Sequence, residues 1–505
     1  MSNWLTTLLS KLKCPLPMRE GWGGSFPREG WGGAVLCCLL ALFLCACSDD
    51  DLAMAPDQQP VCSADTLHMG MILAGNSSPT YQLKLYNRCS KELRLDGIRL
   101  RNAAESGFRI NVDGMNGSEF MDRDLLRIPE GDSLFIFVEA TFPPAGNGLT
   151  THYDYLDILC NSRQQSIVLE AQSKDVLRLT GEVIQADQTW LRGQEIQIFD
   201  SLVVAEGVTL TLEDSVTLYL HDKADIRVRG TLVAEGRQEA PVVIRGDRTD
   251  KMFDNLPYDN LPSQWGSLYI ERSARDCRFE WTDIHGLSTG IHIDSTRVTF
   301  NSCRLRNSDG NLITCHMSDL QLLNSELSNA SGSLLDLYGG WYDIAHCTLA
   351  NYHFASVIRQ PAVHLCNIDT AQAWVTPLHR CNFLNTLVWG RTFNPDVYPE
   401  YYPIALDFDA LGRPVLADSV FSYRFDHCLL RAEGYDDDDF IQTLWNQDPL
   451  YRLIDDDNYT FDFRLQPESP ALGAGASLDS IGLRLPHDLD GMPRDGSRPS
   501  VGCYE

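Results

Sequence analysis

The chain has 505 residues, of which 44% are hydrophobic, and a formal net charge of −28 at pH 7. A surface this acidic repels nucleic acid and anionic lipid head groups, so we expect no nucleic-acid partner. Sixteen cysteines suggest a disulfide framework at first sight. However, no CxxC motif follows residue 47, which leaves the zinc-ribbon and thioredoxin-like classes without support.

Residues 1–46 have the pattern of a lipoprotein signal peptide. An uncharged apolar run over 34–46 follows a segment with four basic residues, and it is too short to span a membrane comfortably. The run ends in a sequence that resembles the bacterial lipobox, Leu44, Cys45, Ala46 and Cys47. We therefore expect the thiol of Cys47 to carry a diacylglycerol. The alternative is an ordinary secretory signal that is cut near Cys47 and leaves it without lipid.

Two segments follow the signal peptide. Residues 47–61 contain the lipidated cysteine and an acidic, proline-containing stretch that we interpret as a solvated tether. Over residues 62–175, apolar and polar residues alternate in short runs such as Tyr81–Leu85 and Ser133–Ala140, with turn residues between them. This pattern predicts a β-sandwich, for which a spacer role is the simplest interpretation.

A repeat of 21 to 22 residues dominates the region 176–460. Four segments align without gaps: Phe279–Ile284, Phe300–Leu305, Leu322–Leu327 and Ile344–Leu349. Two further copies are assigned to Leu378–Phe383, followed by Asn385, and to Phe425–Leu430. Short apolar strands at this spacing predict the windings of a parallel β-helix, in which each winding stacks on the last and buries a continuous core.

Two positions of the repeat have a predicted role in this fold. One position is small and is expected to point into the core, where free cysteine behaves as a small hydrophobe; its residues are Thr282, Cys303, Ser325, Cys347, Cys381 and Cys428. The other is expected to form an asparagine ladder, because asparagine tolerates left-handed turns and its amide can bond from winding to winding; its residues are Asn307, Asn329 and Asn351.

The segments at both ends of the repeat resemble known proteins. Residues 203–246 are similar to the opening windings of right-handed parallel β-helix proteins of the pectate-lyase-like superfamily. Residues 461–505, with Ser469–Ala476 and Pro499–Glu505, resemble the closing segment of secreted bacterial β-helix proteins. With the lipobox and the acidic residues behind it, the chain resembles Bacteroidetes surface lipoproteins of generally unassigned activity. The resemblance implies an all-β protein, with an Ig-like β-sandwich before a right-handed β-helix, anchored by lipid in the outer membrane at the cell surface.

Two interruptions of the repeat, near 247–265 and 389–423, are the expected places for function, because loops on a rigid solenoid carry binding groups. Both contain aromatic residues beside carboxylates, which suits a sugar surface. Together with one outward tryptophan of the repeat, the candidate glycan contacts are Trp265, Trp341, Trp389, Tyr398, Tyr401 and Tyr402. The alternative is that the aromatics pin the insertions to the side of the solenoid.

No catalytic, metal-binding or cofactor-binding motif is recognised. The first hypothesis is a non-catalytic display module for a polysaccharide or a surface protein. The alternatives are a polysaccharide lyase or glycoside hydrolase of the β-helix superfamily, and a purely structural surface component. A groove with outward carboxylates beside Arg or Lys on adjacent windings would favour the enzyme, and a flat aromatic face would favour binding.

Overall fold

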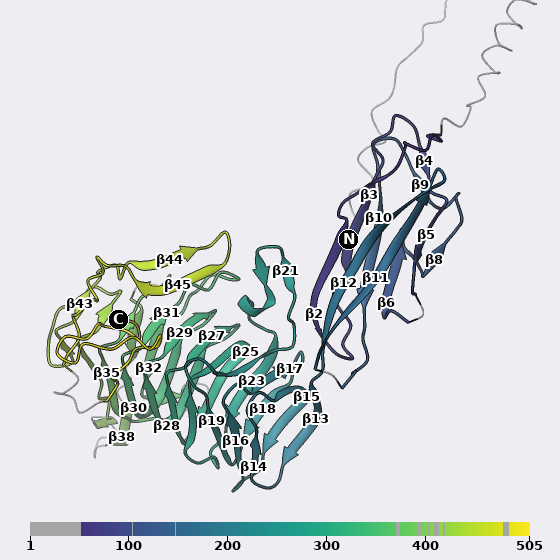
Figure 1. Cartoon of the computed structure of the whole chain (residues 1–505). Helices are drawn as coiled ribbons and strands as arrows, with labels where there is room; N and C mark the ends of the chain where they lie inside the picture. The colour runs from purple at the N-terminus through teal and green to yellow at the C-terminus, as the bar shows by residue number, and fades with distance from the viewer. Residues whose placement is uncertain are drawn as a thin grey trace, which may run out of the picture.

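A computed structural model describes residues 52–103, 105–146, 148–369, 374–391, 395–400, 404–408, 414–417, 420–477 and 484–505. The molecule is 54% strand and 1% helix, which confirms the prediction of an all-β protein. Figure 1 shows an N-terminal part built from β1 to β12 and a larger part that begins at β13. No helix within the described ranges is long and apolar enough to cross a membrane.

The N-terminal part consists of two five-stranded sheets around one core. The first sheet contains, in spatial order, β1 (Val61–Cys62), β3 (Tyr81–Tyr86), β10 (Ser133–Ala140), β6 (Phe108–Val112) and β7 (Met115–Gly117). The second contains β2 (Thr66–Leu73), β12 (Arg163–Lys174), β11 (Leu149–Cys160), β5 (Gly97–Leu100) and β8 (Glu119–Phe120). The short strands β4 (Leu93–Arg94) and β9 (Arg127–Ile128) pair with each other. Alternate residues of both sheets, such as Ile136 and Ile158, point into the shared core, which explains the alternation in the sequence.

The larger part is a single sheet of 25 strands whose pairings are parallel; we call it the coiled sheet. Its first strands are β13 (Leu177–Ile184), β14 (Gln188–Trp190), β15 (Glu195–Val204), β16 (Thr209–Glu213), β17 (Thr217–Leu220), β18 (Asp225–Val228), β19 (Thr231–Glu235), β20 (Val242–Gly246), β23 (Trp265–Ile270) and β24 (Cys277–Glu280). The middle strands are β25 (Thr282–Asp294), β26 (Arg297–Asn301), β27 (Arg304–Ser308), β28 (Ile313–Leu323), β29 (Glu326–Ala330), β30 (Leu335–Ala345), β31 (Thr348–Ala350) and β32 (Val363–Cys366). The last are β35 (Leu378–Leu384), β36 (Leu387–Val388), β37 (Val397–Glu400), β40 (Arg424–Asp426), β41 (Leu429–Leu430), β42 (Phe440–Ile441) and β43 (Leu444–Trp445).

The central windings of the coiled sheet stack in the predicted register. The first apolar residues of the aligned segments pair from winding to winding in the order Phe279, Phe300, Leu322 and Ile344. The last apolar residues pair in the order Ile284, Leu305, Leu327 and Leu349. All of these side chains are buried in one core cluster that runs from β13 to β43. Each winding alone would expose its apolar face, so the stacking supplies the core.

A left-handed corner explains the residue types between the two apolar positions. The residues at this corner have φ between 43° and 55°, and they are Trp281, Ser302, Asn324, His346, Asn385 and His427. Asparagine, serine and histidine tolerate that conformation better than β-branched residues do. The residue after the corner points inward and is buried, as predicted for Cys303, Cys347 and Cys428.

One of the predicted copies is out of register. Phe383, not Leu378, pairs with Ile344, and Cys381 pairs with Tyr342 on the preceding winding. Asn385 therefore lies at the corner beside His346 instead of in the asparagine ladder. Cys381 is buried, as expected, but at a different position of the winding. The prediction is wrong because an insertion lengthens this winding. Its Cys-Asn-Phe sequence resembles the end of a repeat, so the alignment places Phe383 at the last apolar position instead of the first.

The predicted asparagine ladder is present in part. Asn307 and Asn329 have left-handed backbones, with φ of 61° and 59°. The side-chain oxygen of Asn351 accepts a hydrogen bond from the Ala330 amide on the preceding winding, at 3.0 Å. Asn307 differs, because its side chain donates to the carbonyl of Asp259 in the first insertion, at 2.9 Å.

The two insertions are built differently from each other. The first contains β21 (Lys251–Phe253), β22 (Leu256–Pro257) and the short helix η1 (Tyr258–Asn260). It contacts both the N-terminal part and the C-terminal segment, which is the described chain after β43, residues 446–477 and 484–505. The second contributes β37 to the coiled sheet and forms a hairpin of β38 (Ile404–Phe408) and β39 (Pro414–Ala417). A further small hairpin, β33 (Ile368–Asp369) and β34 (Trp374–Val375), precedes β35.

The C-terminal segment covers one side of the coiled sheet. Its hairpin, β44 (Tyr451–Asp455) and β45 (Thr460–Leu465), lies along β27, β29 and β31 in Figure 1. Outward leucines of the windings, including Leu387 and Leu429, pack beneath it together with Val501 and Tyr504. The segment therefore shields an apolar flank that stacking alone would leave exposed.

Candidate functional site

A second side of the coiled sheet carries two rows of outward side chains that we call the aromatic face. Parallel pairing aligns equivalent residues, and alternation turns every second one outward, away from core residues such as Ile291 and Ile293. The first row is Arg227, Tyr269, His292, Thr314, Asp336, His364 and Tyr398. The second row is Asp294, His316, Tyr338, Cys366 and Glu400.

The rings of the aromatic face contact one another along the rows. The guanidinium of Arg227 lies 4.3 Å from the ring centroid of Tyr269, which stacks on His292 at 4.9 Å. In the second row, His316 and Tyr338 stack at 4.8 Å with an interplanar angle of 3°. Stacking covers the faces of the inner rings, so they present mainly their edges and polar atoms to solvent.

A hollow of 640 Å³ opens on the first half of the aromatic face. Its lining combines the Tyr269 and His292 rings with both kinds of charge, including Arg227, Glu271 and Asp294. Arg227 reaches Glu271 at 3.6 Å, so the charges largely balance within the hollow. The volume falls within the range of small-ligand sites, and the lining offers ring, donor and acceptor groups together.

The second half of the aromatic face is organised around His364. Its Nδ1 lies 2.7 Å from a carboxylate oxygen of Asp336 and its Nε2 lies 3.1 Å from a carboxylate oxygen of Glu400. Burial alone would lower the pKa of His364, but the bonds to the two carboxylates outweigh it and raise that pKa. Cys366 lies close to both His364 and Glu400, and burial raises the pKa of its thiol.

Two of the predicted aromatic contacts are exposed. Tyr398 ends the first row with an exposed fraction of 47%, and it stacks on His364 at a centroid distance of 6.2 Å. Trp341 follows the bend at Gly339 and Gly340, is 38% exposed and stacks on His379 at 4.5 Å. Its neighbour Tyr342 is buried, as the alternation of the strand predicts.

Of the other predicted contacts, Trp265 is buried and Trp389 is partly buried. Trp265 has an exposed fraction of 0%, and its indole nitrogen donates to the carbonyl of His285 at 2.7 Å, so its ring serves the core. Trp389 is half-buried and packs against the cluster beneath the C-terminal segment. Tyr401, Tyr402 and the lipobox residues Leu44, Cys45, Ala46 and Cys47 lie outside the described residues.

A charged groove lies between the coiled sheet and hairpin β44–β45; we call it the closure groove. It has a volume of 320 Å³, and its charged residues are Asp283, Arg304, Arg306, Glu326, Asp462 and Arg464. This is the arrangement of carboxylates and arginines on adjacent windings that would favour an enzyme.

Charged residues of the closure groove, however, form ion pairs within the protein. Arg306 binds Asp283 at 3.0 Å, and Arg304 binds Asp490 of the C-terminal segment at 3.2 Å. The pKa of Asp283 is well below its usual range, since Arg306 and His285 outweigh the opposing effect of burial. A carboxyl held in its charged form cannot act as a general acid near neutral pH. The groove is therefore better suited to clamping the C-terminal segment than to acid–base catalysis.

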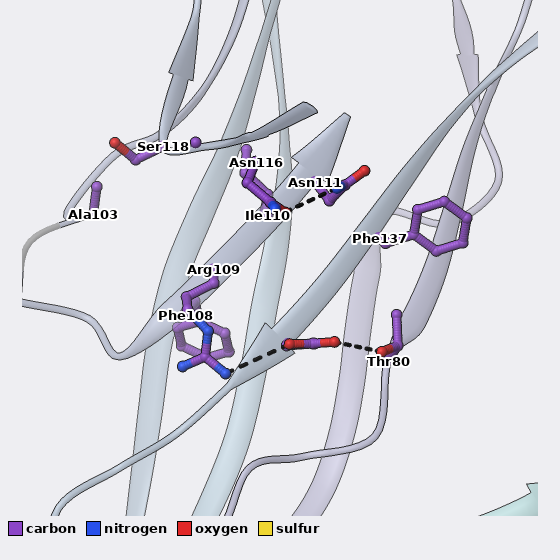
Figure 2. A pocket seen from close by; sticks show the side chains of 11 residues that line it. Thr80, Ala103, Phe108, Arg109, Ile110, Asn111, Asn116, Ser118 and Phe137 are labelled. Atoms are coloured by element: carbon purple, nitrogen blue, oxygen red, sulfur yellow. Dashed lines mark hydrogen bonds and ion pairs between the residues drawn. The ribbon is translucent and has the colours of Figure 1, made fainter. Parts of the chain in front are cut away.

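Another hollow lies on the N-terminal part, and Figure 2 shows its lining. It has a volume of 790 Å³ over β6 and β10. Its polar side chains satisfy one another, as in the bond from Asn111 to Asn116 at 2.8 Å and the ion pair of Arg109 with Glu139 at 3.6 Å. It contains no cysteine or histidine, and nothing in its lining suggests catalysis.

Sequence reasoning missed most of the aromatic face. Tyr269, Asp336 and His364 belong to no local motif, because they come from different windings that insertions separate by unequal numbers of residues. The available signal was the alternation within each strand, which marks them as outward residues once the register of neighbouring windings is known.

Comparisons with known proteins leave the family open. No family model and no curated protein matches the chain. Each of three similar solved structures covers 25% of this chain with a TM-score of 0.17. They are a PapD-like domain of human CEP192 (8% identity, 89% of that chain), a family 123 glycoside hydrolase from Clostridium perfringens (7%, 26%) and a protein of unknown function from Porphyromonas gingivalis W83 (16%, 51%). Likenesses this weak carry no argument about fold or function.

Proposed function

We propose that this protein is a cell-surface lipoprotein that binds glycans through its aromatic face without cleaving them. The observation that carries the proposal is the 640 Å³ hollow in which the Tyr269 and His292 rings lie beside paired charges. Because stacking covers the ring faces, the rings meet a sugar through their edges and polar atoms. The carboxylates and guanidinium groups exchange hydrogen bonds with sugar hydroxyls.

The proposal includes a finer account of the fold and the anchor. The coiled sheet is a right-handed parallel β-helix, the N-terminal part is an Ig-like spacer, and a lipid on Cys47 holds the chain in the outer membrane. Parallel pairing from winding to winding supports the β-helix. The lipobox and the acidic residues behind it support the anchor.

The charge of the protein narrows the class of glycan. A chain with a net charge of −28 repels polyanions at long range, and the charges within the hollow largely balance. A neutral polysaccharide therefore suits the site better than a uronic-acid polymer. The proposed ligand therefore differs from pectate, a uronic-acid polymer and the substrate that the superfamily resemblance implies.

The second candidate is a polysaccharide lyase or hydrolase, and the closure groove is the observation that favours it. Asp283, Arg306 and Glu326 lie on three successive windings within that groove. The pairing of Asp283 with Arg306 makes this candidate the weaker one. A purely structural surface component is the third candidate.

The deciding experiment is a glycan-array screen with the full chain, followed by incubation of the bound polysaccharides with and without calcium. We expect binding without new reducing or unsaturated ends, and we expect Tyr269→Ala to weaken it at least tenfold. Tyr153→Ala is the matched control, because Tyr153 is an exposed tyrosine on β11 of the N-terminal part. New chain ends would support the enzyme, and absence of binding to every glycan would leave the structural role.

A further inference from the structure

Cys366 differs from the cysteines of the repeat. Cys303, Cys347 and Cys428 point inward and belong to the core cluster of the coiled sheet. Cys366 alternates with the core residue Leu365, so it lies on the outward side of β32 and is not part of that cluster. It is nevertheless only 1% exposed. Its thiol donates a hydrogen bond to the Ile368 carbonyl at 3.1 Å, so it belongs to a polar cluster and not to the apolar core.

The neighbours of this thiol are ligand groups from adjacent windings. Cys366 pairs with Glu400 on β37, and His364 lies two residues before it on the same face. One atom of each residue, the thiol sulfur, a carboxylate oxygen and an imidazole nitrogen, lies within 4.8 Å of the other two. The three groups therefore converge on one point above β32 and β37.

The imidazole of His364 is already oriented for binding. Its Nδ1 bonds to Asp336 at 2.7 Å, and the other carboxylate oxygen of Asp336 accepts a bond from the Asn311 amide at 2.6 Å. This arrangement holds the ring and points Nε2 toward Glu400. A histidine ligand whose second nitrogen bonds a fixed carboxylate is the usual supporting arrangement of protein metal sites.

We propose that His364, Cys366 and Glu400 form a binding site for a zinc-like divalent cation, with Asp336 as the residue that positions His364. Tetrahedral bonds of about 2.0 to 2.3 Å place ligand atoms roughly 3.3 to 3.8 Å apart, which the cluster reaches with small side-chain movements. Binding displaces the proton of the thiol, and any proton on the imidazole Nε2, to solvent.

The ligand set selects the class of cation. Imidazole nitrogen and thiolate sulfur favour Zn²⁺ and similar transition-metal ions, whereas calcium and magnesium require oxygen ligands. Three protein ligands leave one tetrahedral position, and because His364 and Glu400 are partly exposed, a water molecule can fill it. The site adjoins Tyr398 but stands independently of glycan binding.

The test measures metal bound to the full chain after equilibration with Zn²⁺ or Co²⁺ and removal of free metal. Five cysteines at or before residue 47 can also hold metal, so the result is the difference between wild type and each variant. We expect wild type to bind one equivalent more than His364→Ala or Cys366→Ser. The Co²⁺ form should show a thiolate charge-transfer band that Cys366→Ser abolishes. Asp336→Asn should weaken Zn²⁺ binding roughly 10- to 100-fold.

Two controls separate the site from general metal affinity. His316→Ala removes a histidine of the same face that lies outside the cluster, and Cys62→Ser removes a half-buried thiol of the N-terminal part; both should bind like wild type. Circular dichroism checks that each variant folds. If Cys366→Ser does not fold, Glu400→Gln replaces it and should bind one equivalent of metal less than wild type. Equal metal content and affinity in wild type and the folded cluster variants would overturn the proposal.

Discussion

Replacing Glu505 by alanine should loosen the C-terminal segment more than replacing its partner Arg494 by methionine. The Arg494 side chain is fully buried, and burial lowers the pKa of its guanidinium. The guanidinium donates to Glu505 at 3.3 Å and to the side-chain oxygen of Asn324 on the coiled sheet at 2.6 Å. The Glu505 carboxylate is therefore the acid that balances a charge enclosed between the segment and the windings.

The two changes differ in what they leave behind. Glu505→Ala leaves a buried cation without its carboxylate, which in buried pairs costs about 3 to 5 kcal/mol. Because Glu505 is 17% exposed, water replaces part of the loss, and we expect about 2 to 4 kcal/mol. Arg494→Met removes the buried charge itself together with a guanidinium Nε that has no partner. It also leaves the buried Asn324 side-chain oxygen without its donor, so we expect a cost of about 1 to 2 kcal/mol.

Amide hydrogen exchange measures this local effect directly. The amides of Leu489 and Val501 bond within the C-terminal segment and report its opening from the windings. At about 1.4 kcal/mol per tenfold change, Glu505→Ala should speed their exchange roughly 30- to 700-fold, and Arg494→Met only about 5- to 30-fold. A larger effect of Arg494→Met, or no effect of Glu505→Ala, would refute the argument from the enclosed charge.

Three further predictions concern the windings. Burial lowers the pKa of His346 to about 3, so the stability it contributes is present above its ordinary pKa of about 6.5 and is lost as the pH falls from there toward 3. His346→Asn should therefore make the unfolding free energy, measured by urea titration between pH 6.5 and 4, less pH-dependent by about 1.4 kcal/mol per pH unit. Burial raises the pKa of the Cys347 thiol to about 12, so mass spectrometry should find it unmodified after native alkylation at pH 8 while the half-buried Cys62 reacts. Gly340→Ala should destabilise the fold by about 1 to 3 kcal/mol in the same urea assay, because φ is 97° and a Cβ would lie 2.4 Å from the Ser318 carbonyl oxygen; a neutral result would show that the bend relaxes freely.

The sequence predicted the central windings because their spacing is regular. Between Phe279 and Leu349 no insertion interrupts the repeat, so aligned letters and paired strands coincide. The prediction failed at Leu378–Phe383, where the β33–β34 hairpin changes the length of the winding. Cys381 resembles the small inward residues that follow the corner, although it pairs with the large Tyr342. Residue type alone does not fix register once the period is broken.

The candidate site was harder to predict than the fold. The sequence predicts Tyr398 from its place in an aromatic insertion and Trp341 from the alternation of its strand, and both rings are exposed. Trp265 is predicted on the same pattern of aromatic residues beside carboxylates in an insertion, but its side chain fills the core. The local sequence does not distinguish a buried tryptophan at the end of an insertion from an exposed one. His364 and Glu400 are 36 residues apart and converge through strand pairing across an insertion. Pairing of this kind depends on the length of the insertion, which the local sequence does not encode.

The left-handed corner also limits how the chain can change in length. Loss or gain of a single residue between the apolar positions would move His346, for example, out of the corner and put a neighbouring side chain into a backbone conformation that most residues avoid. Removal or duplication of one complete winding of about 22 residues would preserve every corner and every inward position. Natural variants should therefore differ in length by whole windings or by insertions outside the strands, so that the number of windings, and with it the length of the exposed face, changes in discrete steps.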